Sequence, residues 1–456
     1  MTAETTLEQG TVPSGTLFRF ATAGSVDDGK STLVGRLLHD SKAILADQLD
    51  AVARTSEARG FGGEKGGLDL ALLTDGLRAE REQGITIDVA YRYFATDRRT
   101  FILADCPGHV QYTKNTVTGA STADAVVLLI DARKGVLEQT RRHLSVAALL
   151  RVPHVVVAVN KIDLVDFSET VFSAISADVA RVAAELGLRE AVAVPVSALD
   201  GDNVVDRSDR TPWYTGPTML ELLETLPGTD ELDDAQEAFR FPVQTVIRPQ
   251  GALAPGLDEG EFRDYRAYAG QVTEGIVRVG DRVSVVTPGQ TARETTVVGI
   301  DVAGRSLEEA AAPLSVALRL ADEFDVARGD TIAAAGTLPE STADLYGSLC
   351  WLSTKPLREG AKVLVKHGTS TVRALVRSVT GKLDLDSFEV APANGLELND
   401  IGEAQLRLAA PLPLEPYAAH RRTGAFLVID PQDGSTLAAG MVRPHPGDTE
   451  DERYWI

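Results

Sequence analysis

The stretch of sequence that decides the fold is Gly24-Ser25-Val26-Asp27-Asp28-Gly29-Lys30-Ser31-Thr32. It has the spacing G-x-x-x-x-G-K-S of a phosphate-binding loop, and it lies between strand-like residues and a run with apolar residues at helical spacing. Glycines let the backbone N–H groups surround phosphate oxygens, and the positive end of the following helix points at the same anion. We expect all nine residues to contact a nucleotide, with Lys30 at the β- and γ-phosphates and the Ser31 hydroxyl on Mg²⁺. The alternative interpretation is a plain glycine turn before a helix.

Composition narrows the class of protein. The chain has 456 residues, a formal net charge of −21 and two cysteines. At ~150 residues per domain, this length predicts about three domains. The negative charge argues against nonspecific binding to nucleic acid or to an anionic membrane, so we expect neither as a partner. The polar N-terminus has no signal-peptide core, and no run approaches the ~18 consecutive apolar residues of a membrane span. We therefore expect a soluble cytoplasmic protein.

A second motif follows in the order that nucleotide hydrolases require. It is Asp105-Cys106-Pro107-Gly108-His109, at the end of a predicted strand. Asp105 can hold a Mg²⁺-bound water, and the N–H of Gly108 can contact the γ-phosphate. His109 is the candidate for orienting the attacking water through a hydrogen bond, which does not need strong base character. We interpret Cys106 as a packing residue. The alternative for the whole motif is an ordinary strand-to-helix turn.

Two further segments predict that the nucleotide is GTP. Asn160-Lys161-Ile162-Asp163 ends another buried strand, and Ser197-Ala198-Leu199 follows a later one. The Asp163 carboxylate can accept hydrogen bonds from guanine N1 and N2, which adenine cannot offer, and a site built for such bonds rejects the analogue strongly. Asn160 and Lys161 are expected to brace the loop and pack on the base, and residues 197–199 to supply a backbone N–H to the guanine carbonyl. A helix N-cap is the alternative for residues 160–163 alone.

A long glycine-rich loop at residues 54–76 precedes Thr86, the expected switch threonine. Its hydroxyl can bind Mg²⁺ only when the γ-phosphate is present, so the loop orders with GTP and loosens after hydrolysis. The expected catalytic residues are therefore Lys30, Thr86 and His109. The expected Mg²⁺ ligands are Ser31, Thr86 and Asp105. Two roles stay open: Arg81 could stabilise phosphate charge or be a solvated arginine, and Asp27 could help to bind a monovalent cation.

The pattern of apolar runs changes near the middle of the chain. Continuous runs such as 125–130 and 155–159 alternate with helical stretches in the first half, which is typical of a parallel sheet buried on both faces. After residue 237, short β-rich runs separated by Gly and Asp turns predict small closed barrels. The expected fold is an α/β P-loop GTPase domain followed by two small β-barrel domains. The expected segments are a flexible tail at 1–15, the GTP-binding domain at 16–230, and barrels at 238–337 and 343–456.

These motifs resemble those of the translation-factor class of GTPases, such as elongation factor Tu, which share a GTPase domain followed by two β-barrels. This resemblance covers nearly the whole chain. A narrower resemblance, to the GTPase large subunit of bacterial sulfate adenylyltransferase, is carried by DDGKSTLVGRLL at 27–38, LDLALLTDGL at 68–77, AEREQGITIDVAYRYF at 79–94, QYTKN at 111–115 and TGASTAD at 118–124. Elongation factors typically carry a histidine where this loop has Asp28, and a different switch segment.

The narrower resemblance implies a heterodimer. A smaller subunit makes adenylyl sulfate and pyrophosphate from ATP and sulfate, and the large subunit hydrolyses GTP to drive this unfavourable first step of sulfate assimilation. Some relatives carry an adenylylsulfate kinase domain with its own phosphate loop. The sequence has no second motif of this kind, so we expect that activity to be absent. Two alternatives stay open, an elongation factor-like GTPase that carries aminoacyl-tRNA and a regulatory GTPase that acts on another protein.

Overall fold

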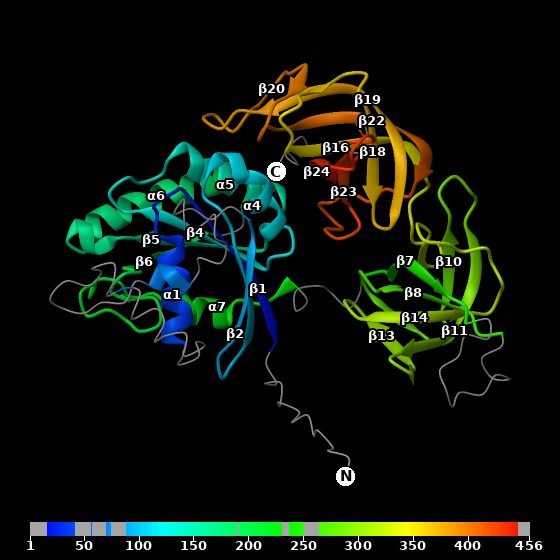
Figure 1. Cartoon of the computed structure of the whole chain (residues 1–456), viewed down its shortest axis with the longest axis horizontal. Helices are drawn as coiled ribbons and strands as arrows, with labels where there is room; N and C mark the ends of the chain where they lie inside the picture. The colour runs from blue at the N-terminus through cyan, green and yellow to red at the C-terminus, as the bar shows by residue number, and fades with distance from the viewer. Residues whose placement is uncertain are drawn as a thin grey trace, which may run out of the picture. The chain divides into compact units, whose positions relative to one another are not determined.

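Two structural units divide the chain, one at residues 1–228 and the other at residues 229–456. A computed structural model describes residues 16–41, 56, 70–73, 88–188, 191–229, 237–249 and 264–445. The first unit is built on one sheet with helices packed against it, and the second consists of two β-barrels (Figure 1). This arrangement confirms the predicted fold class. Among the described residues, no helix combines the length and the apolar character that crossing a membrane requires.

The sheet of the first unit has the strand order β2-β3-β1-β4-β5-β6. Its strands are β1 (Leu17–Gly24), β2 (Ala90–Ala95), β3 (Thr100–Asp105), β4 (Ala125–Asp131), β5 (His154–Asn160) and β6 (Ala191–Pro195). All neighbours pair in parallel except β2 and β3, which form an antiparallel hairpin. Every residue of β4 is buried, and this burial on both faces explains its continuous apolar run.

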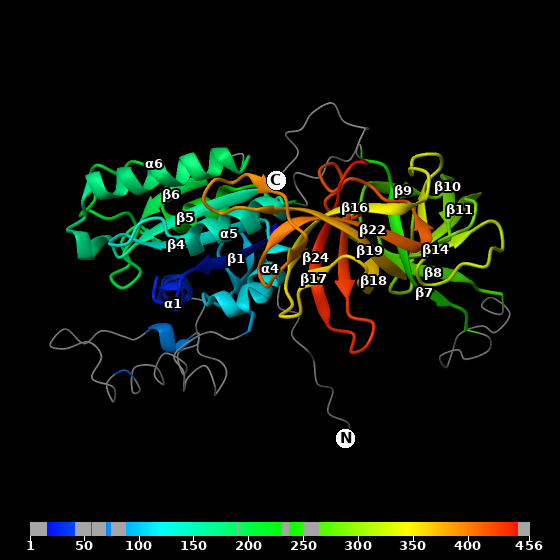
Figure 2. The same ribbon diagram turned by 90° about the horizontal axis from the view of Figure 1, so that it is seen from above.

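Helices cover the sheet. They are α1 (Lys30–Asp40), α4 (Thr113–Ala120), α5 (Glu138–Leu149), α6 (Glu169–Glu185) and α7 (Met219–Thr225), with 3₁₀ turns η2 (Leu70–Leu73), η3 (Val110–Tyr112) and η4 (Ile162–Val165). Apolar residues of α1 and α7 share one core cluster with alternate sheet residues such as Phe20 and Leu129. Figure 2 shows α6 on one side of strands β4–β6 and α1 on the other. Ser168 caps α6, and Thr218 with Glu221 forms a capping box on α7.

Parallel pairing brings the carboxyl ends of the strands to one edge of the sheet. β1 lies between β3 and β4, so the strand order changes direction there. Open α/β sheets bind their ligands in the crevice outside such a switch point, at the carboxyl ends of the strands. The phosphate loop follows β1, the second motif follows β3 and the base-recognition segment follows β5. The fold therefore brings the three predicted motifs to the same edge.

Each barrel of the second unit is a sheet closed on itself. The first has the order β10-β15-β7-β8-β14-β11, and β10 pairs with β11 to close the ring. The second has the order β18-β23-β24-β16-β22-β19, and β18 pairs with β19. Closure pairs the backbone N–H and C=O groups that the edge strands of an open sheet would leave exposed. Inward-facing positions alternate with outward-facing ones, so each barrel has its own apolar core, around Phe241 in the first and Trp351 in the second.

The described elements of the second unit are strands. In the first barrel they are β7 (Arg240–Ile247), β8 (Ala267–Gln271), β9 (Ile276–Arg278), β10 (Arg282–Val286), β11 (Arg293–Val302), β12 (Arg305–Leu307), β13 (Glu309–Ala311), β14 (Ser315–Leu320) and β15 (Thr331–Ala334). In the second barrel they are β16 (Thr342–Trp351), β17 (Leu357–Arg358), β18 (Lys362–His367), β19 (Ser370–Leu383), β20 (Val390–Ala391), β21 (Gly395–Leu396), β22 (Ile401–Leu412), β23 (Ala425–Ile429) and β24 (Thr436–Val442).

A cluster of four charged or titratable side chains joins the two barrels, and we call it the interbarrel cluster. Arg240 and Glu274 come from the first barrel, and Glu415 and His420 from the second. Arg240 Nη2 lies 2.7 Å from Glu415 Oε1, and His420 Nδ1 lies 2.8 Å from Glu274 Oε2. Thr423 Oγ1 bridges the two carboxylates, at 3.1 Å from Glu274 Oε1 and 2.8 Å from Glu415 Oε2. The arginine and both glutamates are buried.

Candidate nucleotide-binding site

The backbone of the phosphate loop has positive φ angles at its glycines. Gly24 has φ 143°, Asp27 has φ 67° and Gly29, the N-cap of α1, has φ 94°. A Cβ on Gly29 would lie 2.3 Å from Asn160 Nδ2, and one on Gly24 would lie 2.9 Å from the Leu129 carbonyl oxygen. A side chain at either glycine would therefore meet both backbone strain and a clash. Ser31 and Thr32 follow on the first turn of α1, half-buried.

Lys30 spans the loop from inside. Its side chain is almost fully buried, and its Nζ donates to the carbonyl oxygens of Gly24 at 2.9 Å and Ser25 at 2.8 Å. Burial lowers the pKa of Lys30, and the nearby carboxylates of Asp105 and Asp28 act in the opposite direction. A buried ammonium at this position supplies concentrated positive charge to an anion in the loop.

Asp28 is buried behind the loop and braces it. Its Oδ2 accepts a hydrogen bond from the backbone N–H of Ser25 at 2.8 Å, and its Oδ1 lies 3.8 Å from Lys134 Nζ. Burial raises the pKa of the Asp28 carboxyl, and the Ser25 N–H, Lys30 and Lys134 act against that rise. The carboxylate is thus held inside the protein by one backbone donor on Oδ2, while Oδ1 has no hydrogen-bond partner among the described residues. This placement explains how an acidic residue fits in a loop built for phosphates.

The second motif lies directly against the phosphate loop. A Cβ on Gly108 would lie 2.3 Å from Lys30 Nζ and 2.6 Å from the Gly24 carbonyl oxygen, so a larger residue would push the loop. Asp105 at the end of β3 accepts a hydrogen bond from Thr22 Oγ1 at 2.8 Å, and the same hydroxyl accepts from the N–H of Cys106 at 3.2 Å. The sequence did not identify Thr22, which lies in β1 beside β3.

His109 and Cys106 lie in contrasting surroundings. The His109 side chain is exposed, its Nδ1 accepts from the Gln111 N–H at 3.2 Å, and its ring lies edge-on to Tyr112. A neutral ring that accepts at Nδ1 carries its proton on Nε2, and no described residue bonds that nitrogen. His109 can therefore offer an N–H to a water. Cys106 is fully buried, and burial raises the pKa of its thiol, which fits the packing role. Pro107 is buried next to it.

Asn160 joins the base-recognition segment to the phosphate loop. It is buried at the end of β5, its Nδ2 donates to the Asp28 carbonyl oxygen at 2.8 Å, and its Oδ1 accepts from the Ala198 N–H at 3.0 Å. One side chain thus connects the loops after β1, β5 and β6. Asp163 follows on η4, half-buried, while Ser197 is buried and Leu199 is exposed. Hydrogen bonds of Asn160 thus connect the three segments.

The predicted residue Lys161 and three charged residues that the sequence motifs did not indicate, Asp131, Arg133 and Arg36, hold these loops in place. Lys161 Nζ donates to the Asp27 carbonyl oxygen and lies 3.1 Å from Asp131 Oδ2 at the end of β4. Burial acts to raise the pKa of Asp131, but the bonds from Arg133 and Lys161 outweigh it and hold that pKa below its usual range. Arg36 of α1 donates to the Ala198 and Leu199 carbonyls. An acidic residue ending a buried strand was the one available signal for Asp131.

Several predicted residues lie outside the described residues. They are Thr86, Arg81 and all but Ser56 and η2 of the stretch from residue 54 to 87. Among the described residues, the Ser31 hydroxyl and the Asp105 carboxylate are oxygen ligands of the kind Mg²⁺ prefers. They lie at the two loops that meet at Lys30, which fits a cation beside phosphates. The binding of a monovalent cation by Asp27 stays a prediction.

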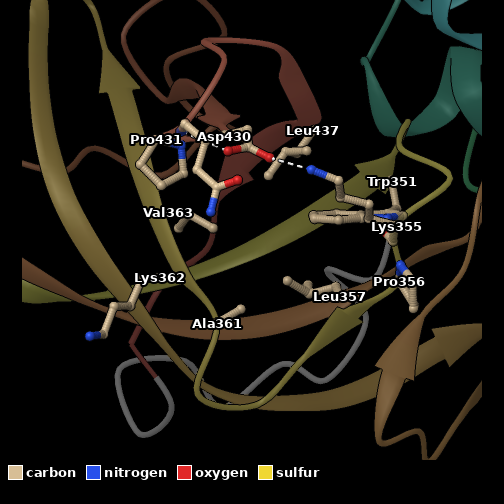
Figure 3. Close-up of a pocket in the computed structure, with 11 residues that line it drawn as sticks. Trp351, Lys355, Pro356, Leu357, Ala361, Lys362, Val363, Asp430, Pro431 and Leu437 are labelled. Atoms are coloured by element: carbon tan, nitrogen blue, oxygen red, sulfur yellow. Dashed lines mark hydrogen bonds and ion pairs between the residues drawn. The ribbon is translucent and has the colours of Figure 1, made fainter.

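Three cavities lie away from the phosphate loop. One of about 320 Å³ lies under Tyr91 and Tyr93 of β2, and one of about 680 Å³ lies on the barrels along β7, β8 and β14. Figure 3 shows a smaller one, of about 230 Å³, in the second barrel. There Lys355 and Asp430 form an ion pair at 3.0 Å, and the buried Trp351 donates to the Lys355 carbonyl oxygen at 2.8 Å. These contacts lie along the wall of the cavity.

Two protein families match this chain, and both agree with the GTPase motifs described above. Residues 16–230 match the family described as the elongation factor Tu GTP binding domain. Residues 345–443 match the family described as GTP-eEF1A C-terminal domain-like. The fold and the site together define a GTP-binding protein of the elongation factor Tu class.

Whole-chain relatives narrow this class further. The chain is 47% identical over 426 residues to sulfate adenylyltransferase subunit 1 of Cellvibrio japonicus, covering 93% of this chain and 86% of that protein. It is 44% identical over 428 residues to the same subunit of Aliarcobacter butzleri, covering 94% and 87%. It is 48% identical over 431 residues to the bifunctional enzyme CysN/CysC of Mycobacterium tuberculosis, covering 94% and 67%. The chain belongs to the sulfate adenylyltransferase subunit 1 family, as the sequence motifs predicted.

Proposed function

We propose that the chain is the GTP-hydrolysing subunit of a heterodimeric sulfate adenylyltransferase. One observation carries the proposal: Asn160 joins the phosphate loop and the guanine-recognition segment into a single site, in a chain of this family. In the proposal, residues 16–230 bind and hydrolyse GTP, and the barrels at 238–337 and 343–456 complete the subunit, in the cytoplasm. The partner is the smaller subunit, which converts ATP and sulfate to adenylyl sulfate and pyrophosphate.

The proposed roles follow from the contacts. Backbone N–H groups of the loop at 24–32 surround the phosphates, and Lys30 neutralises the β- and γ-oxygens. Ser31, Asp105 and Thr86 would hold Mg²⁺, which would supply further positive charge to those oxygens. The Gly108 N–H contacts the γ-phosphate, and the exposed His109 Nε2–H orients the attacking water. Asp163 accepts from guanine, with the loop at residues 197–199 against the carbonyl of the base.

The proposed roles of the two subunits can be tested by mixing the purified chain with the smaller subunit. The isolated chain, given ATP, sulfate and Mg²⁺, should make no adenylyl sulfate, because its one phosphate loop is joined to a guanine-selective segment. With the smaller subunit it should do so, and GTP should raise the yield. A wild-type pair that gives no gain with GTP, together with binding of aminoacyl-tRNA by the chain, would favour the elongation factor-like alternative.

The coupling to hydrolysis is tested by His109→Ala. This variant should keep GTP binding and partner association, because the imidazole is exposed and belongs to the loop after β3, whereas the base-recognition segment follows β5. GTP hydrolysis should slow by roughly 10²–10⁴, as expected for losing a positioned proton-handling group. Phosphate release and adenylyl sulfate are measured in the same reaction, in wild type and variant. Slow hydrolysis with an undiminished gain in synthesis would mean that GTP binding alone does the work, and the hydrolysis-driven mechanism would be wrong.

A further inference from the structure

An arginine on α1 bonds the backbone of the loop at residues 197–199. Arg36 lies on the helix that begins at Lys30, and its side chain is 18% exposed. Its Nε donates to the Ala198 carbonyl oxygen at 3.2 Å, and its Nη2 donates to the Leu199 carbonyl oxygen. Its Nη1 lies 3.6 Å from Asp40 Oδ1, one turn later on the same helix. Each guanidinium nitrogen thus has a partner, and this fixes the orientation of the planar group.

The loop is held from two sides. On one side, the Ala198 N–H donates to Asn160 Oδ1 at 3.0 Å. On the other, a Cβ on Gly201 would lie 3.5 Å from Arg36 Cδ, so the loop also packs on the stem of the arginine. Among the described residues, Arg36 is the one side chain that bonds the carbonyl oxygens of Ala198 and Leu199. Its guanidinium therefore determines how this part of the backbone is turned.

A bond to a carbonyl also fixes the N–H of the same peptide group. The peptide between Ala198 and Leu199 is trans, and in a trans peptide the C=O and the N–H point in opposite directions. Because Arg36 directs the Ala198 carbonyl toward α1, the N–H of Leu199 points away from α1. Within the described ranges, this N–H donates to no other group, so it stays available to a ligand.

The position of the loop decides whether it can recognise a base. A hydrogen bond weakens steeply when its donor is misaligned, so a backbone N–H that reads a carbonyl must be held in place. We propose that Arg36 is a positioning residue of the base site: by holding the carbonyls of Ala198 and Leu199, it aligns the N–H groups of the loop with the guanine carbonyl. The helix that starts at the phosphate loop thereby also supports base recognition. The inference deepens the proposed GTP binding and rests on it.

Two nucleotides separate this role from a general effect on folding. GDP carries the guanine carbonyl, whereas 2-aminopurine riboside diphosphate lacks that carbonyl and the N1 hydrogen but keeps the 2-amino group and the phosphates. Arg36→Met keeps an apolar stem without a donor. We expect it to weaken GDP binding by about tenfold, as for the loss of one hydrogen bond. Its affinity for the analogue should stay within about twofold of wild type. The dissociation constants are measured by calorimetry on the full chain.

Arg36→Lys provides a second variant at the same position. Its ammonium keeps the charge and can donate, but it lacks the planar fork that spans two carbonyls. The loss should again be confined to GDP, and it should be smaller than in Arg36→Met. If Arg36→Met does not fold, the same comparison of GDP with the analogue is made on Arg36→Lys and decides.

The matched control is Arg99→Met. Arg99 is 4% exposed, and its Nη1 donates to the carbonyl oxygens of Leu223, at 3.2 Å, and Leu226. It directly precedes β3, at the edge of the sheet opposite to the phosphate loop, so its loss should lower stability and leave the ratio of the two affinities unchanged. The inference is wrong if Arg36→Met loses affinity for both nucleotides alike or for neither. A wild type that binds GDP no better than the analogue would instead overturn the proposed guanine site.

Discussion

At the scale of single residues, the candidate site is held by buried side chains that bind other parts of the protein. Thr22 fixes Asp105, Asp131 fixes Lys161, and Asn160 fixes two loops at once. Catalytic and binding groups need such support, because a misplaced group loses most of its effect. The exposed His109 and the half-buried Asp163 are then left with atoms that can act on a ligand.

Asp163 is the residue on which nucleotide choice should depend. Asp163→Asn turns an acceptor carboxylate into an amide that presents a donor to guanine's own donors. We expect GTP affinity to fall by about 10²-fold, through the loss of charge-assisted hydrogen bonds. Xanthosine triphosphate offers an acceptor at the same place, so its affinity should rise. Both affinities are measured by nucleotide competition, and unchanged GTP binding would remove Asp163 from the base site.

At the scale of elements, the site depends on loops that follow three different strands. The Asn160 side chain joins the loops after β1, β5 and β6, and its removal leaves the buried Ala198 N–H and Asp28 carbonyl without their partner. Asn160→Ala should therefore cost about 1–3 kcal/mol in the free energy of unfolding and also weaken nucleotide binding.

A matched variant makes this prediction specific. Asn203 is equally buried. Its Nδ2 donates to the Pro195 carbonyl oxygen at 2.8 Å and to Thr211 Oγ1 at 2.9 Å, and neither partner belongs to the phosphate loop. Asn203→Ala should show a similar loss of stability in urea unfolding with much less loss of nucleotide affinity. Equal effects of the two variants on affinity would mean that Asn160 acts only through stability.

The features that could be predicted from the sequence are those determined by local sequence patterns. The buried runs of β4 and β5 and the order of the motifs follow from periodicity and spacing, because neighbouring residues carry the signal. Arg36 and Thr22 gave no such signal. Each acquires its role from a partner far along the chain, Ala198 for Arg36 and Asp105 for Thr22, and only the folded sheet brings them together. Thr86 stays a prediction, since it lies outside the described residues.

At the scale of the second unit, the interbarrel cluster is an ion network and not a metal site. The ligand atoms of Glu274, Glu415 and His420 lie within 4.8 Å of one another, a spacing that could suit a cation. However, the Arg240 guanidinium already bonds Glu415, and Thr423 and His420 donate to the carboxylates. With His420 protonated, two positive groups balance two carboxylates. Its charge state should therefore set how strongly the barrels are joined.

This balance predicts a pH dependence with a definite sign. The hydrogen bond to Glu274, assisted by the charge of Glu415, raises the pKa of His420 above 6.5, against burial and the charge of Arg240. A raised folded-state pKa gives stability that is fully present below 6.5 and lost as pH rises through the raised value. Burial acts to raise the pKa of Glu415, but Arg240, Thr423 and His420 lower it below 4.5 overall, so its contribution is lost only as pH falls through that lower value.

His420→Asn tests the alkaline side of this prediction. The amide can still donate to Glu274, but it carries no charge and does not titrate near neutrality, so the pH-dependent part should disappear. Hydrogen exchange of β7 and β22 peptides in the full chain is compared between wild type and variant at about pH 6 and about pH 8.5, where the intrinsic exchange rates cancel in each comparison. We expect wild type to be the better protected at the lower pH and the difference to shrink at the higher one. A difference of the same size at both pH values would show that His420 contributes no charge to the interbarrel cluster.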